Sequence, residues 1–308
     1  MIHRMRHDYV ELIFIYLCAV GILLILVSIA TPLSYQKIGI IAPEKPIEES
    51  PFIFNSTIFS QVSVQAKAYV VYDIINQKVV AGKDENNPLP LASLTKVMTA
   101  VSSLSHNPRD TKIIIKPASL DGSYDLGLKK NQVWTLQELL KYTLIFSSND
   151  GAQVISDTLG GRTTFVEQMN QDAKALGLNS FIFTQPAGLD LNGKLGGKGS
   201  ALDVAKLFTI ALKQFPDILD ATTKTRGTFT ASNSKIVGIP NTNQDIERLF
   251  GAEASKTGFT DSAGGNLAVV VDIAVGHPVV IVVLGSTRDA RFTDMQTLYQ
   301  TLEKSLIH

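Results

Sequence analysis

The sequence has very few residues of the kinds that form disulfides or bind transition metals. It contains one cysteine, Cys18, which excludes a disulfide within the chain and any paired-thiolate site for zinc or iron. Three of the five histidines, His3, His7 and His308, lie at the chain ends, and His277 lies in a Gly-His-Pro turn. None is placed for a Ser-His-Asp triad or a zinc cluster, so hydrolytic chemistry here would need another base. We expect no metal and no cofactor.

An excess of charge of one sign is also missing. Lys plus Arg number 28 and Asp plus Glu number 28, which gives a formal net charge of zero. This balance gives no support to a nucleic-acid partner, which would favour a basic face. Hydrophobic residues make up 45% of the 308 residues, so one large domain with a sizeable core is possible.

An apolar run occupies residues 12–30, and Arg4 and Arg6 precede it. A helix of about 19 residues, rising about 1.5 Å per residue, nearly matches a hydrocarbon core of about 30 Å. The positive flank favours a cytoplasmic tail at residues 1–11 and an exported remainder. We therefore expect a single-pass anchor in the cell membrane, with an extracytoplasmic catalytic domain. The alternative is a cleaved signal peptide, because small residues at 28–30 resemble a cleavage site.

Prolines break up the next segment. Pro32, Pro43, Pro46 and Pro51 disfavour a helix over residues 31–60, because proline lacks a backbone donor and restricts the residue before it. We expect a semi-extended tether there. The catalytic domain would then cover residues 61–308.

Strand patterns lie at both ends of the exported part. Residues 66–75 and 78–81 predict a hairpin, and two apolar strands are expected at 266–275 and 279–285. Helical spacing follows over residues 292–307.

Helix-start signals fill the middle of the chain. Thr135 and Glu138 form a capping box that opens a helix through Phe146. Thr164 is expected to open a second helix and Ser200 a third. This order favours an α/β (α+β) fold, with one antiparallel sheet and a helical subdomain inserted into it.

A Ser-x-x-Lys motif occurs at Ser93 and Lys96. Residues three apart on a helix share one face, so the lysine amine can lie beside the serine hydroxyl and take its proton. One match is weak evidence, because Ser34 and Ser232 begin the same pattern elsewhere in the chain. A solvated helix face is the alternative for any single match.

Two further motifs follow in order. Ser147 and Asn149 form Ser-x-Asn, which either caps a following helix or points a hydroxyl and an amide into a cleft. Lys256, Thr257 and Gly258 form Lys-Thr-Gly, which is either a turn or an edge strand facing a substrate. Ser-x-x-Lys, Ser-x-Asn and Lys-Thr-Gly in this order are typical of β-lactamases and penicillin-binding proteins.

The chain resembles the D-alanyl-D-alanine carboxypeptidase family, the low-molecular-mass penicillin-binding proteins, over about residues 64–304. The segments at 90–100, 146–152 and 256–267 are similar to the surroundings of the family's three motifs, and Pro186-Ala187-Gly188-Leu189 fits the intervening pattern. The resemblance implies a five-stranded antiparallel sheet flanked by helices, β-lactamase/transpeptidase-like. It also implies cleavage of peptidoglycan stem peptides ending in D-Ala-D-Ala, and acylation by β-lactam inhibitors.

The resemblance also implies a role for each motif residue. Ser93 would be the nucleophile, Lys96 its general base, and Lys256 a nearby cation that keeps Lys96 deprotonated. Ser147 would pass a proton to the leaving amine, with Asn149 in support.

Substrate-binding roles are implied in the same way. The backbone N–H groups of Ser93 and Phe259 would form an oxyanion hole. Thr257 and Arg291 would hold the terminal carboxylate, and Gly258 would allow close backbone approach. Arg291 follows the apolar strand expected at 279–285, which we expect to lie beside the Lys-Thr-Gly strand. Phe259 stands where many relatives carry histidine, and Gly265 stands where tyrosine is common, so the leaving-group preference is open.

Three other functions share these motifs. A DD-endopeptidase that cuts peptide crosslinks is the near alternative. A class A β-lactamase would need a deacylating glutamate, and Glu167 fits its helix better than that role. A non-enzymatic β-lactam sensor would need a cytoplasmic signalling part, and only about 11 residues precede the expected anchor.

Overall fold

A computed structural model describes residues 52–116, 128–232 and 234–307. Within these ranges no helix has both the length and the apolar character needed to cross a membrane. The expected tail at 1–11, the anchor at 12–30 and the tether up to residue 51 lie outside the described residues. They stay predictions. Residues 52–60, which the sequence placed in the tether, form β1 (Ile53–Phe54) and most of the 3₁₀ turn η1 (Ser56–Gln61), and Phe59 is buried in the core of the domain.

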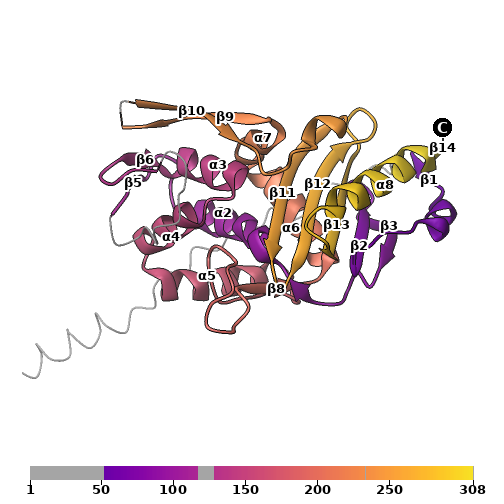
Figure 1. Cartoon of the computed structure of the whole chain (residues 1–308), viewed down its shortest axis with the longest axis horizontal. Coiled ribbons are helices and arrows are strands. Elements are labelled where there is room, and N and C mark those ends of the chain that lie inside the picture. The colour runs from indigo at the N-terminus through magenta and orange to yellow at the C-terminus, as the bar shows by residue number, and fades with distance from the viewer. Residues whose placement is uncertain (1–51, 117–127, 233, 308) are drawn as a thin grey trace, which may run out of the picture. The chain divides into compact units, whose positions relative to one another are not determined.

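The centre of the domain is a five-stranded antiparallel sheet with the order β11-β12-β13-β2-β3 (Figure 1). Its strands are β2 (Ala68–Asp73), β3 (Lys78–Lys83), β11 (Ala252–Thr260), β12 (Gly264–Asp272) and β13 (Pro278–Ser286). The expected hairpin and the two expected C-terminal strands are all present, with ends shifted by a few residues. The Lys-Thr-Gly segment lies in β11 at one edge of the sheet, as its edge-strand interpretation predicts.

Both faces of this sheet are covered, which explains the unbroken apolar runs in its central strands. On one face, Val269, Ile281 and Val283 pack with Leu298 and Leu302 of α8 (Ala290–Ser305). On the other face, alternate residues of the same strands join the core of the helical region, which includes α6 (Ala201–Gln214). Ala254 of β11 belongs to this second core, on the face of the sheet that the helical region covers.

The helices between β3 and β11 form the inserted subdomain (Figure 1). Besides α6 they are α2 (Thr95–His106), α3 (Leu136–Phe146), α4 (Asn149–Thr158), α5 (Arg162–Ala175) and α7 (Pro216–Asp220). Thr135 caps α3 by accepting a hydrogen bond from the backbone N–H of Glu138, and Ser200 caps α6 in the same way, as expected.

Two helix boundaries differ from the sequence expectation. The helix expected to open at Thr164 begins at Arg162, because Gly161 adopts φ +89° and its carbonyl already accepts the N–H of Phe165. The last helix ends at Ser305, not at Ile307, because Leu306 and Ile307 form a strand.

Short strand pairs and turns complete the described fold. The pairs are β1 (Ile53–Phe54) with β14 (Leu306–Ile307), β5 (Lys112–Ile114) with β6 (Val133–Thr135), β9 (Arg226–Ala231) with β10 (Ser234–Pro240), and β8 (Gly197–Gly199) with both β4 (Leu89–Pro90) and β7 (Ile182–Phe183). The 3₁₀ turns are η1 (Ser56–Gln61), η2 (Ala92–Leu94), η4 (Ala221–Thr223) and η5 (Ile246–Arg248). The first of these pairs joins the two ends of the described chain.

Candidate active site

The three motifs, which are far apart in the sequence, meet where the helical subdomain faces β11. Ser93 lies in η2, immediately before α2, and Lys96 lies in the first turn of α2. Ser147 directly follows α3, Asn149 is the first residue of α4, and Lys256 lies in β11. The structure thus brings every motif residue that the sequence singled out into one group.

Lys96 links the first motif to the second. Its side chain is fully buried, and its Nζ donates hydrogen bonds of 2.8 Å to Ser93 Oγ, to Asn149 Oδ1 and to the carbonyl of Ala187. An ammonium group has three N–H donors, and these three acceptors match them. A neutral amine has two N–H donors and a lone pair, and of the three partners only the Ser93 hydroxyl can donate to that lone pair, which can then take the hydroxyl proton.

Lys256 links the second motif to the third. Its Nζ donates to Ser147 Oγ and to the carbonyl of Thr257, each at 2.9 Å. Burial is the main cause that places the pKa of Lys256 well below its usual value, and repulsion from the cations Lys96 and Arg291 lowers it further. The site therefore holds two buried lysines, each hydrogen-bonded to a different motif serine.

The segment around Ser147 connects two helices and also carries side chains of the site. Ser147 ends α3 in the left-handed conformation, with φ 63° and ψ 33°, which is uncommon for a residue with a Cβ. Ser148 caps α4 by accepting a hydrogen bond of 2.7 Å from the N–H of Gly151. The capping interpretation of this motif is therefore right for Ser148, while Ser147 and Asn149 face the two lysines.

Gly258 brings the backbone of β11 against the nucleophile turn. A Cβ placed on Gly258 would lie 2.9 Å from Leu91 O and 3.2 Å from Ser93 N, closer than normal contacts allow. Only a glycine permits this approach of backbone to backbone. The two residues expected to supply oxyanion-hole N–H groups, Ser93 and Phe259, consequently lie in touching segments.

Arg291 reaches the Lys-Thr-Gly strand from the first turn of α8. Its Nη1 donates a hydrogen bond of 2.8 Å to the carbonyl of Gly258. The expectation that β13, the strand before Arg291, lies beside the Lys-Thr-Gly strand is wrong, because β12 separates them. The side chain spans this gap instead. Burial and repulsion from Arg288, partly offset by attraction to Asp289, lower the pKa of Arg291 to about 10.

Other contacts at the site were not predicted from the sequence. Thr257 Oγ1 donates 2.6 Å to Thr242 Oγ1, and the buried Asn266 side chain joins β12 to Pro90 O and to the N–H of Gly285. The segment Pro186-Ala187-Gly188-Leu189 fits the family pattern, but the sequence assigned no role to it. In the structure it supplies the Ala187 carbonyl to Lys96. No sequence signal marks a backbone acceptor, since every residue has a carbonyl group.

The competing candidates lie elsewhere. Ser232 lies in the turn between β9 and β10, where its Oγ accepts from Val133 N, so Ser232 and Lys235 do not share a helix face. Ser34 lies outside the described residues. His277 pairs with Asp73 at 3.1 Å between Nε2 and Oδ2, in the β13–β2 part of the sheet. Among the described residues, Ser93 and Lys96 are therefore the Ser-x-x-Lys pair whose two side chains are hydrogen-bonded to each other.

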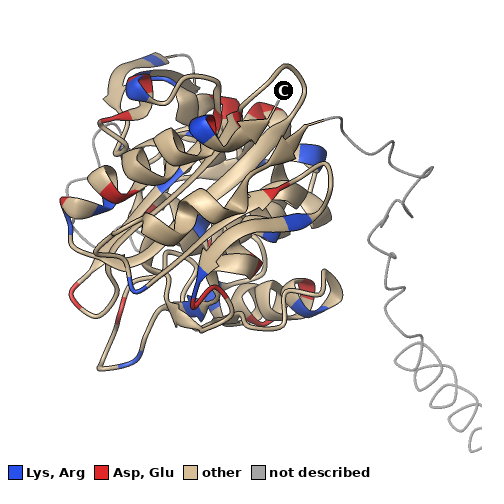
Figure 2. Cartoon of the chain, turned by 90° about the vertical axis from the view of Figure 1, so that its right-hand side faces the viewer, with Lys and Arg blue, Asp and Glu red and all other residues tan. Residues whose placement is uncertain are grey.

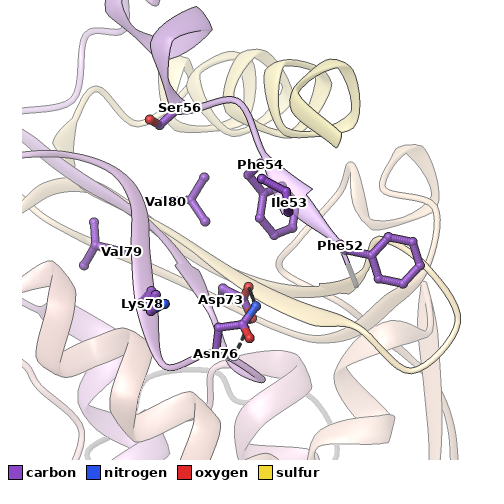
Figure 3. A pocket seen from close by; sticks show the side chains of 9 residues that line it. All are labelled: Phe52, Ile53, Phe54, Ser56, Asp73, Asn76, Lys78, Val79 and Val80. Atoms are coloured by element: carbon purple, nitrogen blue, oxygen red, sulfur yellow. Dashed lines mark hydrogen bonds between the residues drawn. The ribbon is translucent and has the colours of Figure 1, made fainter. Parts of the chain in front are cut away.

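A cavity of about 290 Å³ lies at the sheet edge opposite β11 (Figure 3). Its walls come from residues 52–56 and from β3, with Asp73 and Asn76 at one side. This cavity is therefore separate from the serine–lysine group. Among the described residues, no cluster of three or more His, Cys, Asp or Glu side chains is arranged to hold a metal ion.

Comparisons with known proteins agree with this geometry. A profile of the D-alanyl-D-alanine carboxypeptidase family matches residues 55–288. A D-alanyl-D-alanine carboxypeptidase of Mycobacterium tuberculosis is 31% identical over 199 residues, which cover 64% of this chain and 67% of the relative. A D-alanyl-D-alanine endopeptidase of Escherichia coli is 29% identical over 256 residues, 80% of each chain.

Solved structures show the same likeness. The crystal structure of a D-alanyl-D-alanine carboxypeptidase of Mycobacterium tuberculosis superposes with a TM-score of 0.71 at 27% identity, covering 78% of this chain and 91% of that one. Penicillin-binding protein D2 of Listeria monocytogenes, in its ampicillin-bound form, gives a TM-score of 0.69 at 28% identity, covering 79% and 99%. The chain belongs to the D-alanyl-D-alanine carboxypeptidase family, peptidase family S11, and is a DD-peptidase of that family.

Proposed function

We propose that the protein is a serine-type D-Ala-D-Ala carboxypeptidase that trims peptidoglycan stem peptides and is acylated by penicillin. The observation that carries this proposal is the pair of buried lysines, in which Lys96 bonds to Ser93 and Lys256 bonds to Ser147. Such a pair supplies a base for the attacking hydroxyl and a proton path to the leaving group, without histidine or metal.

Acylation begins at Ser93. Lys96 takes the hydroxyl proton while Ser93 Oγ attacks the carbonyl carbon of the penultimate D-alanine. The carbonyl oxygen gains negative charge, which the N–H groups of Ser93 and Phe259 stabilise. Asn149 and the Ala187 carbonyl hold the Lys96 amine in place through their 2.8 Å hydrogen bonds.

Collapse of the intermediate breaks the amide bond. The leaving nitrogen takes a proton from the Ser147 hydroxyl, and Lys256 replaces that proton through its 2.9 Å hydrogen bond. The proton taken from Ser93 stays on Lys96 until hydrolysis of the ester, when it returns to Ser93 Oγ and a proton of the water restores Lys256. Thr257 and Arg291 bind the terminal carboxylate of the departing D-alanine, and Arg291 releases its bond to the Gly258 carbonyl as it does so. Water then hydrolyses the ester on Ser93 and restores the enzyme.

An endopeptidase is the second candidate, because curated relatives of both kinds match this chain. Both reactions cleave the same kind of bond, and they differ in the size of the leaving group. A class A β-lactamase is less well supported, because Glu167 is exposed on α5 and does not join the serine–lysine group. A non-enzymatic β-lactam sensor has no structural feature in its favour among the described residues.

We also propose that the domain acts outside the cell, attached to the membrane through the apolar segment at residues 12–30. The support is the sequence pattern, in which Arg4 and Arg6 precede the apolar run. A mature N-terminus near Thr31, found by mass spectrometry of the cell-free fraction, would contradict the anchor.

The central test combines labelling with turnover. We expect Ser93→Ala to abolish covalent labelling by fluorescent penicillin, while the matched control Ser232→Ala labels like the wild type. Persistent labelling of Ser93→Ala would disprove the mechanism. Release of free D-alanine from a D-Ala-D-Ala pentapeptide, compared with cleavage of a crosslinked muropeptide dimer, then separates the carboxypeptidase from the endopeptidase.

A further inference from the structure

A phenylalanine and a glycine face each other on the two strands at the β11 edge of the sheet. Phe259 of β11 and Gly265 of β12 are directly paired in the sheet register. Phe259 directly follows Gly258, whose backbone touches the Ser93 turn. Phe259 and Gly265 therefore lie at the rim of the proposed substrate groove.

Gly265 allows a loop to pack on this end of the sheet. A Cβ on Gly265 would lie 1.9 Å from Thr287 O and 3.2 Å from Arg288 N, so any larger residue would push the loop at 287–289 away. With glycine at this position, the loop backbone rests on β12. The side chain at the centre of the loop, Arg288, is thereby brought over β11.

Arg288 uses this position to stack on Phe259. Its guanidinium carbon lies 4.8 Å from the centre of the Phe259 ring, a cation–π contact that fixes the direction of an otherwise flexible side chain. Arg288 is exposed, and across residues 52–116, 128–232 and 234–307 it forms no ion pair or hydrogen bond. A fixed cation without an anionic partner has its donors free for a ligand.

The direction of the groove indicates which part of a substrate reaches this cation. Ser147 and Thr257, proposed to serve the leaving D-alanine, lie on the Lys256 side of Gly258. The acyl part of the substrate must leave Ser93 in the other direction, along Phe259 and Thr260. Successive residues of a strand advance by about 3.4 Å, so Phe259 lies about 7 Å beyond Thr257.

Among the described residues, no acidic side chain forms an ion pair with Arg288. Asp190 accepts hydrogen bonds from Thr260 Oγ1 at 2.8 Å and from Gly196 N at 3.0 Å. These bonds tie the loop around residues 190–196 to the end of β11. The positive charge of Arg288 contributes to the lowered pKa of Arg291.

We infer that Arg288, stacked on Phe259 and positioned by Gly265, forms a subsite for a carboxylate on the acyl side of the substrate. The inference rests on the proposed function and deepens it. The enzyme would prefer stem peptides in which the residue before the two D-alanines carries a negative charge. This carboxylate is distinct from the C-terminal one assigned to Arg291.

The test uses matched substrates and matched variants. Acyl-L-Glu-D-Ala-D-Ala and acyl-L-Gln-D-Ala-D-Ala differ only by a charge on the acyl side. We expect the wild type to cleave the glutamate peptide with a kcat/KM about 3- to 5-fold higher, the range expected for one exposed ion pair, and to lose this preference in 0.5 M salt. Arg288→Gln should remove the preference, whereas Lys235→Gln, which removes an exposed cation from β10, should keep it.

A second measurement is independent of peptide turnover. Carbenicillin carries a carboxylate on its acyl side chain, and benzylpenicillin lacks it, so the ratio of their acylation rates reports the same subsite. Arg288→Gln and Gly265→Ala should lower this ratio, while Lys235→Gln should not. An unchanged ratio and an unchanged peptide preference in Arg288→Gln would overturn the subsite. If no D-alanine is released but the ratio of acylation rates by carbenicillin and benzylpenicillin still depends on Arg288, the proposed carboxypeptidase activity is wrong and the proposed subsite is supported.

Discussion

The contact between Gly258 and the Ser93 turn leads to a quantitative prediction. In Gly258→Ala the new Cβ would meet Leu91 O at 2.9 Å, Ser93 N at 3.2 Å and Ala92 Cβ at 3.3 Å. Ordinary contacts for such atoms begin near 3.4 Å, so β11 must move away by about 0.5 Å. Backbone atoms cannot rotate aside as a flexible side chain can, and the strand itself must therefore shift.

This shift should affect chemistry more than stability. A displacement of about 1 Å from the reactive geometry costs about 100-fold in rate, so half of that displacement should slow acylation about 10-fold. Overpacking costs about 1–3 kcal/mol, and the strand can relax because it lies at the sheet edge, so we expect the lower end of this range. For a domain of this size about 1 kcal/mol corresponds to a fall of about 2–4 °C in Tm.

The assay measures the second-order rate constant for acylation by fluorescent penicillin, beside thermal unfolding of the same preparation. Gly82→Ala is the matched control, because the atoms nearest to a Cβ on Gly82 of β3 are Oε2, Cδ and Cγ of Glu85, at 2.9–3.2 Å, all in one flexible side chain. We expect its acylation rate to equal that of the wild type. Wild-type acylation by Gly258→Ala, or an equal loss in both variants, would refute the argument that backbone contact at residue 258 sets the site geometry.

Two further predictions concern the cations of the site. Arg291→Ala should slow hydrolysis of a free-acid D-Ala-D-Ala peptide about 10-fold or more, since a charge-assisted hydrogen bond is worth about 1.5–3 kcal/mol, and should affect the C-terminally amidated peptide far less; equal losses on both peptides would contradict a carboxylate-binding role. Lys256→Met should abolish acylation yet raise Tm at pH 7, because burial and repulsion from Lys96 and Arg291 disfavour the charged Lys256. The pKa of Lys256 in the folded state lies below its ordinary value of 10.5 in the unfolded chain, so the free energy of unfolding of the wild type rises with pH between these two pKa values. The difference in Tm between Lys256→Met and the wild type should therefore shrink as the pH approaches 10.5. A lower Tm for Lys256→Met across this pH range would show that its hydrogen bonds outweigh the repulsion.

The parts of the fold that could be predicted are those with a local signal. Thr135 and Ser200 mark helix starts through a side chain that bonds to a backbone N–H three residues later, and the structure contains both bonds. The central strands were predicted because apolar residues follow one another without interruption in β12 and β13. The start of α5 was misplaced because Gly161, with φ +89°, was not considered as the residue before a helix.

The parts that could not be predicted depend on residues distant in sequence. The order of the three motifs indicated that Lys96 and Asn149 belong to one site, but not that the third acceptor of Lys96 is the Ala187 carbonyl, 91 residues away. Arg291 was assigned to the terminal carboxylate through the family resemblance, and β13 was expected to border the Lys-Thr-Gly strand. The strand order shows that β12 lies between them, which the apolar pattern alone does not encode.

Pairing of β1 with β14 has a consequence for how the domain meets its surroundings. Ile53 lies opposite Ile307 and Phe54 opposite Leu306, so the first and last described strands form one antiparallel pair. Residues 52–56 also line the cavity beside β3, at the sheet edge opposite β11 (Figure 3). In the ribbon view of Figure 2, positions of lysine and arginine are interspersed with positions of aspartate and glutamate. Attachment through residue 52, or a fusion added after residue 307, would therefore leave the β11 edge free to meet an extended polymer.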